Sequence, residues 1–90
     1  MEKPDLYVVA RFLDIMFSNG SSMKKTNIQM LLGVNYPRFM EYLEWLLKRD
    51  LVAANLDEEG TERIKLTPKG IDSYHRLVDW IKETLEGVKI

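Results

Sequence analysis

The segment from Lys24 to Tyr36 constrains the fold of this chain more than any other part of the sequence. A short helix-forming stretch ends at Gly33, and Asn35 and Pro37 follow almost at once. Glycine adopts the left-handed conformation that ends a helix, and asparagine caps the start of the next one. Proline is tolerated in a first helical turn because its missing N–H has no intrahelical partner there. The segment therefore predicts two helices joined by a tight turn.

The stretch before this turn predicts a first helix over residues 6–17, where apolar side chains recur at helical spacing between a capping Asp5 and Gly20. Its other side carries a second apolar stripe, formed by Val8, Phe12 and Ile15. A helix that is apolar on two sides has to pack on two sides. Its second partner is either the C-terminal helix or another copy of the chain.

The loop at residues 18–22 predicts a second helix that is capped by Ser21 or Ser22 and runs to about Leu32. The third helix is expected from Asn35 to about Asp50. Its predicted buried face consists of Phe39, Leu43, Leu46 and Leu47.

Two short, partly alternating runs, residues 51–56 and 61–66, flank the turn-forming residues 57–60 and predict a β-hairpin. Thr67 is placed to cap a last helix over residues 68–86, with Pro68 at its first position. The apolar seam of that helix is Ile71, Tyr74, Val78, Ile81 and Leu85.

This order of elements predicts an α+β, mostly α, fold: a winged helix-turn-helix with a three-helix core, a β-hairpin wing and a C-terminal dimerisation helix. We expect residues 1–90 to form a single domain, because 90 residues are too few for two cores. The architecture presents one exposed helix in an orientation suited to the major groove of DNA.

Several short motifs recur in this order in one known family. They are Lys25-Thr26 with Ile28, Asn35-Tyr36, Leu46-Leu47 before Leu51-Val52, and Leu66-Thr67-Pro68-Lys69-Gly70. Between about Leu13 and Leu85 the chain resembles the archaeal winged-helix family that includes small dimeric DNA-binding chromatin proteins of hyperthermophiles. The resemblance implies duplex DNA as the partner and a dimer formed through the last helix. The chain departs from the chromatin type in its lower basicity, its shorter last helix and its acidic hairpin tip, residues 57–59.

The charge of the chain argues against indiscriminate DNA coating. Its net charge is -1 and its pI is about 5.8, whereas affinity for nucleic acid depends largely on Lys and Arg at phosphates. Residues 1–50 carry seven basic and six acidic side chains, and residues 51–90 carry six and eight. The absence of cysteine excludes disulfides and thiolate chemistry, and no uncharged stretch approaches the ~20 residues of a membrane span. We expect a cytoplasmic, nucleoid-associated protein.

Candidate DNA contacts fall on three predicted elements. On the third helix, Arg38, Tyr42, Trp45 and Arg49 form one stripe, and Asn35 and Tyr36 lie at the end that enters the groove. Lys24 and Lys25 begin the second helix, and Arg63 and Lys65 point outward from the hairpin; both pairs are candidate phosphate contacts. The alternatives are that Tyr42 and Trp45 pack internally and that these basic pairs are ordinary solvated charges.

The predicted dimer interface combines the spare stripe of the first helix with the last helix, because one chain has more apolar surface than it can cover. Its expected members are Val8, Phe12, Ile15, Tyr74, Leu77, Val78, Trp80, Ile81 and Leu85.

No residue pattern indicates an enzyme, a metal site, a cofactor or a small-molecule ligand. His75 is the only histidine, and no acid-base constellation or glycine-rich phosphate loop is present. The sequence therefore predicts a homodimeric DNA-binding transcriptional regulator. The alternative is a winged-helix module for protein assembly that does not bind DNA.

Overall fold

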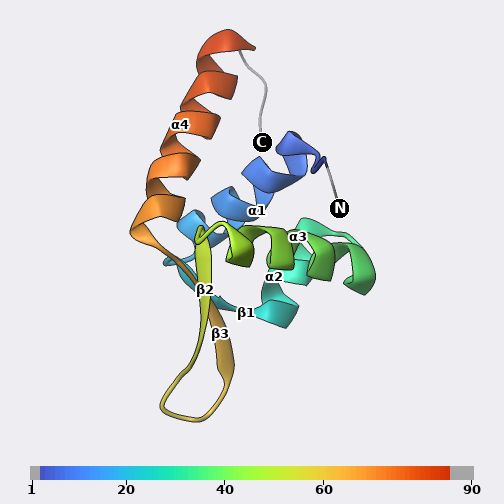
Figure 1. Ribbon diagram of the computed structural model, residues 1–90, viewed down its shortest axis with the longest axis vertical. Coiled ribbons are helices and arrows are strands. Elements are labelled where there is room, and N and C mark those ends of the chain that lie inside the picture. The colour runs from blue at the N-terminus through green and yellow to red at the C-terminus, as the bar shows by residue number, and fades with distance from the viewer. Residues whose placement is uncertain (1–2, 86–90) are drawn as a thin grey trace.

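The computed structural model describes residues 3–85, which form four α-helices and three β-strands (Figure 1). The elements are α1 (Leu6–Ser18), β1 (Ser22–Lys24), α2 (Lys25–Leu32), α3 (Tyr36–Lys48), β2 (Val52–Leu56), β3 (Glu62–Leu66) and α4 (Pro68–Thr84). The strands form one antiparallel sheet in the order β1-β3-β2. The predicted fold class, a winged helix-turn-helix, is confirmed. None of the described helices is long and apolar enough to cross a membrane.

The starts of α1 and α3 lie where the local sequence predicts them. The Asp5 carboxylate accepts the Tyr7 N–H at 2.9 Å, and the Asn35 side chain accepts the Arg38 N–H at 2.9 Å. Gly33 ends α2 in the left-handed conformation, at φ 75°. These side chains satisfy backbone groups that have no intrahelical partner.

The predicted start of α2 is wrong. Ser21 and Ser22 do not cap it, because residues 22–24 form β1 and pair with β3. Lys24 occupies the N-cap position and makes no side-chain capping bond within the described residues. The strand is three residues long, and its partner lies far along the chain, so no local pattern indicates it. The expected last helix ends at Thr84, and position 86 lies outside the described residues.

The two apolar sides of α1 are covered within the same chain. On one side Phe12 is fully buried and its ring stacks on Phe39 of α3 at 5.7 Å. On the other side α4 packs along α1, with the Tyr74 hydroxyl donating to Asp14 at 2.8 Å and the Phe17 and Tyr74 rings 4.6 Å apart (Figure 1). The second partner of α1 is therefore α4.

This packing corrects part of the predicted dimer interface. Four of its expected members are buried in the core of one chain: Phe12, Tyr74, Val78 and Ile81. Val8, Ile15 and Leu77 are partly buried against the same core. Only Trp80 and Leu85 are exposed, at 58% and 48%.

The wing is an extension of the β2-β3 hairpin beyond the helical body (Figure 1). Ile64 and Leu66 face the core, and Arg63 and Lys65 alternate to the opposite face, as predicted. At the tip, the Asp57 carboxylate accepts the N–H groups of Glu59 and Thr61, both at 2.9 Å. The acidic tip is therefore an ordered turn.

The start of α4 is packed directly on the connection between α3 and β2. The Thr67 N–H donates to the Leu51 carbonyl at 3.2 Å, and the Thr67 hydroxyl donates to the Asp50 carbonyl at 2.6 Å. A Cβ atom at position 70 would lie 1.9 Å from the Leu51 oxygen. Only glycine permits this approach, which fixes α4 and the wing relative to α3.

Candidate nucleic-acid interface

The turn between α2 and α3 is held in place from α1. The Arg11 guanidinium donates to the carbonyls of Leu31 and Leu32 at 3.2 and 3.0 Å. These two carbonyls belong to the last turn of α2, where helical carbonyls have no intrahelical partner. Arg11 therefore joins α1 to the helix-turn-helix and sets the direction in which α3 leaves it.

The N-terminal end of α3 presents Asn35, Tyr36 and Arg38 to solvent. Tyr36 is 56% exposed, and Asn35 is engaged as the helix cap. The Arg38 guanidinium lies 5.4 Å from the Tyr42 ring centroid and makes one long hydrogen bond, 3.5 Å, to the Tyr42 hydroxyl. Most of its five donors remain available for a guanine edge or a phosphate.

Tyr42 is not part of this surface, so its predicted role as a DNA contact is wrong. Its side chain is 2% exposed, and its hydroxyl accepts the Asp5 N–H at 3.0 Å. The hydroxyl thereby ties the start of α1 to the middle of α3. Tyr42 does lie on the same side of α3 as Arg38, as the helical spacing predicts, but the start of α1 covers this position.

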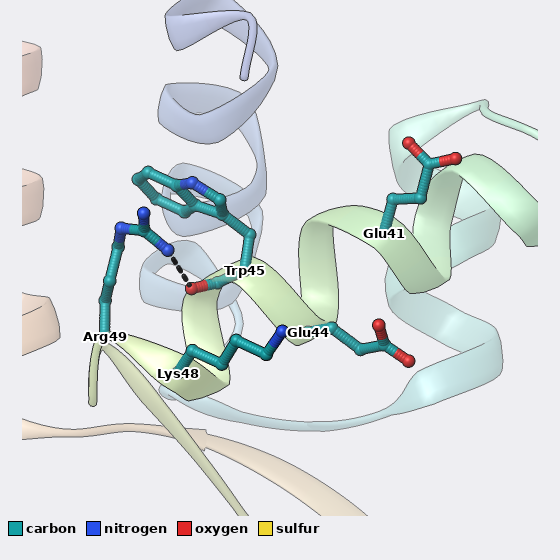
Figure 2. A pocket seen from close by; sticks show the side chains of 5 residues that line it. All are labelled: Glu41, Glu44, Trp45, Lys48 and Arg49. Carbon is teal, nitrogen blue, oxygen red and sulfur yellow. Dashed lines mark hydrogen bonds between the residues drawn. The ribbon is translucent and has the colours of Figure 1, made fainter. Parts of the chain in front are cut away.

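Trp45 and Arg49 form a packed pair at the C-terminal half of α3 (Figure 2). The Arg49 guanidinium lies 3.9 Å from the centroid of the Trp45 ring and donates to the Trp45 carbonyl at 3.3 Å. Trp45 also packs on the core, and its indole nitrogen is buried with no hydrogen-bond partner among the described atoms. The alternative that Trp45 packs internally agrees with this arrangement.

The outward face of α3 also carries the carboxylates of Glu41 and Glu44, two residues that the sequence pattern did not single out as contacts. Glu41 and Glu44 are exposed beside Lys48, and together with the Trp45–Arg49 pair they line a surface pocket (Figure 2). Within residues 3–85 neither glutamate forms an ion pair. The sequence could have indicated this, because Glu41 and Glu44 are spaced so that they lie on the side of the helix opposite the buried Phe39, Leu43 and Leu46. The face is therefore partly acidic.

Lys25 joins two elements of the candidate surface, α2 and β3. It is the first residue of α2, and its ammonium lies 2.6 Å from the carboxylate of Glu62, the first residue of β3. The hydrogen bond to Glu62 raises the pKa of Lys25 above its ordinary value, and a smaller electrostatic contribution comes from Tyr36. The start of α2 therefore lies beside the first residue of β3, at the end of the wing strands next to the tip turn.

The other predicted basic contacts lie on the outer face of the sheet. Lys24 and Arg63 are cross-strand neighbours, and Lys65 is the neighbour of Ser22. Lys24 and Lys65 are exposed, whereas Arg63 donates to the Ser22 hydroxyl at 3.0 Å and the Ser22 carbonyl at 2.8 Å. Arg63 thus holds β1 to β3.

The acidic wing tip lies next to part of this basic row. A second surface pocket is lined by Lys24 and Arg63 together with Asp57, Glu58 and Glu59. Carboxylates so close to the basic side chains reduce their attraction for phosphate.

His75 is exposed on α4, against the Phe17 ring at a centroid distance of 5.1 Å. Among residues 3–85, no three histidine, aspartate or glutamate side chains gather closely enough to hold a metal ion.

Together, the helix-turn-helix, the hairpin wing and the three-helix core define a winged-helix fold. No protein-family profile matches the sequence, and no curated protein sequence matches it. Among solved structures, the chain is similar to F93 from STIV, a winged-helix DNA-binding protein. The TM-score is 0.83 at 15% identity, over 97% of this chain and 100% of the STIV chain.

The chain is also similar to longer bacterial regulators. A MarR-family transcriptional regulator from Silicibacter pomeroyi superposes over 91% of this chain with a TM-score of 0.70 at 22% identity. MepR, a transcription regulator of the Staphylococcus aureus multidrug efflux pump MepA, superposes over 86% with a TM-score of 0.76 at 18% identity. The chain spans 58% of each regulator. These similarities establish the winged-helix fold. They do not confirm the predicted resemblance to archaeal chromatin proteins.

Proposed function

We propose that this chain is a DNA-binding transcription regulator that binds duplex DNA as a homodimer and acts at the nucleoid in the cytoplasm. The observation that carries the proposal is the match to a winged-helix DNA-binding protein over essentially the full length of both chains. The exposed N-terminal end of α3, held at a fixed angle by Arg11, supports it, since this end of a recognition helix usually contacts base edges.

Within this proposal the predicted contacts take different roles. Arg38 hydrogen-bonds to a base edge, Asn35 caps the start of α3, and Tyr36 contacts the sugar-phosphate backbone. Lys24, Lys25 and Lys65 hold phosphates. Arg63 contributes mainly by holding β1 in the sheet, because its guanidinium already has two partners there.

The charges of the surface favour selective binding over DNA coating. Glu41 and Glu44 on α3 and the acidic wing tip repel phosphates that approach in the wrong position. A carboxylate inside the major groove accepts a hydrogen bond from a cytosine amino group. Binding to random DNA is therefore weak, and a site that places a cytosine at these side chains is preferred.

The binding experiment is a fluorescence-anisotropy titration against random duplex DNA and against a duplex obtained by selection, at two salt concentrations. Arg38→Ala is expected to weaken binding to the selected duplex by about 1–3 kcal/mol and to change random binding little. Lys24→Gln is expected to weaken both and to reduce the salt slope by about one unit. The matched control is Arg76→Ala, because Arg76 is exposed on α4 and paired with Asp72. Equal losses for Arg38→Ala and Arg76→Ala contradict the proposed role of α3.

The proposed dimer uses the exposed part of the predicted interface. Trp80 lies in the second half of α4, Leu85 is the C-cap of that helix, and Leu6 is exposed at the start of α1. The Asp14–Tyr74 bond joins the second half of α1 to the first half of α4, and from there the start of α1 and the end of α4 extend toward the same end of the molecule (Figure 1). Light scattering is expected to return twice the 10.6 kDa chain mass, and Trp80→Glu the single mass. A wild-type monomer at micromolar concentration contradicts the dimer.

The second candidate function is protein assembly without DNA binding. It is favoured by the acidic outward face of α3 and by Leu56, which is 69% exposed on the wing. The same titration separates the two functions. A DNA-binding domain binds random duplex with a Kd of about 10⁻⁴–10⁻⁶ M, in a strongly salt-dependent manner. No binding at low salt supports the assembly function.

A further inference from the structure

The ion pair between Lys25 and Glu62 lies where a phosphate of bound DNA is expected. Lys25 is the first residue of α2, the first helix of the helix-turn-helix, and Glu62 is the first residue of β3 in the wing. Their side chains are 33% and 46% exposed. Both partners are therefore accessible to a ligand approaching from solvent.

The start of α2 otherwise has no anionic or capping group in the described residues. Lys24 at the N-cap makes no side-chain bond to the helix, and the first turn contains no acidic residue. Exposed N–H groups at a helix start favour an anion, and a lysine beside them adds a positive charge. Glu62 is the anion that the folded chain itself supplies to Lys25.

We propose that Glu62 is an internal competitor for DNA: its carboxylate occupies Lys25 in the free protein, and a phosphate of the duplex replaces it on binding. The inference rests on the proposed function and adds a form of autoinhibition to it. Both ligands are oxyanions that accept hydrogen bonds from the same ammonium, so they cannot use it fully at the same time. After the exchange, Glu62 is left close to the bound phosphate and opposes it.

This exchange penalises binding at every sequence by a similar factor. Random duplex therefore binds weakly, whereas a cognate site offsets the penalty through contacts of α3 with base edges. The device agrees with the net charge of -1 and with the other carboxylates on the same surface.

The test is a double-mutant cycle on Lys25→Gln and Glu62→Gln, with affinity for random duplex DNA measured by anisotropy at several salt concentrations. Glu62→Gln is expected to strengthen binding about three- to tenfold and to steepen the salt slope by about one unit. The matched control is Asp72→Asn, which removes the same charge from an exposed ion pair on α4, away from the candidate surface, and is expected to change affinity less than about twofold. In the Lys25→Gln background, the gain from Glu62→Gln is expected to fall to the value of the control.

Thermal unfolding of each variant separates competition from a structural role. Glu62→Gln removes an ion pair, so its Tm is expected to be equal to or lower than that of the wild type. Its DNA binding is nevertheless expected to be stronger. A purely structural pair predicts weaker binding instead. The inference is overturned if Glu62→Gln binds no better than Asp72→Asn, or if its gain persists without Lys25. If the wild-type protein and all variants fail to bind DNA at low salt, the proposed function fails as well, and this result differs from a wild type that binds but is not improved.

Discussion

The close approach of Gly70 to Leu51 makes Gly70→Ala the substitution whose cost the structure defines best. A Cβ atom there would lie 1.9 Å from the Leu51 oxygen and 2.9 Å from its carbonyl carbon. Both contacts are with backbone atoms, so no side-chain rotation relieves them. Either α4 or the α3-β2 connection has to move by more than about 1 Å.

Such a movement weakens the bonds that Thr67 makes to the carbonyls of Asp50 and Leu51. Two hydrogen bonds at about 1 kcal/mol each, with an overpacking cost of about 1–3 kcal/mol, oppose the folded state. Replacing a helical glycine by alanine returns about 1 kcal/mol. We therefore expect the free energy of unfolding to fall by about 2–4 kcal/mol.

Urea denaturation followed by circular dichroism measures this change. Gly60→Ala is the control, because Gly60 has a positive φ of 80° but no atom within 4 Å of an added Cβ. Its expected cost is only the conformational one, about 1–2 kcal/mol. A stable Gly70→Ala protein, with an unfolding free energy equal to that of the wild type, refutes the steric argument.

Three further substitutions test individual contacts by urea denaturation and DNA titration. Tyr42→Phe removes the acceptor of the Asp5 N–H and is expected to cost about 1 kcal/mol of stability without changing DNA affinity; a large affinity loss contradicts its assignment to the core. Asn35→Ala removes the α3 cap and is expected to cost about 1 kcal/mol of stability and to weaken DNA binding, whereas Asn35→Ser keeps a capping side chain and is expected to retain the stability and the affinity. Burial and the bond to Asp14 raise the pKa of Tyr74 to about 12, from an ordinary value of 10.0. The folded state therefore holds this proton more tightly, and stability is lost as the pH rises from 10 to 12, by about 2–3 kcal/mol. Tyr74→Phe is expected to lose less stability than the wild type over that pH range. If the two proteins have the same pH dependence of stability, the raised pKa of Tyr74 is contradicted.

Local signals in the sequence determined most of the secondary structure. Asp5 and Asn35 begin helices and Gly33 ends one, because each acts on backbone groups within a few residues of itself. The alternation around Ile64 predicted which face of the wing is buried, for the same reason. These elements in order were sufficient to predict a winged helix-turn-helix.

Tertiary packing decided which side chains of each helix are buried. Helical spacing placed Tyr42 beside Arg38, but the covering of Tyr42 depends on where the start of α1 lies. In the same way, the stripe containing Phe12 was correctly predicted to need a second partner, and only the structure identifies the partners of α1 as α3 and α4 of the same chain. Periodicity gives the direction of a side chain and not what lies in that direction.

The charge pairs of the candidate site also depend on the tertiary structure. Lys25 and Glu62 meet only because β1 pairs with β3 and brings the start of α2 to the first residue of β3. The sequence by itself determined the number and order of charges, the starts of α1, α3 and α4, and the wing. The fold decided which charges neutralise each other and which remain for DNA, because electrostatic interactions depend on distance in space and are largely screened beyond about 10 Å.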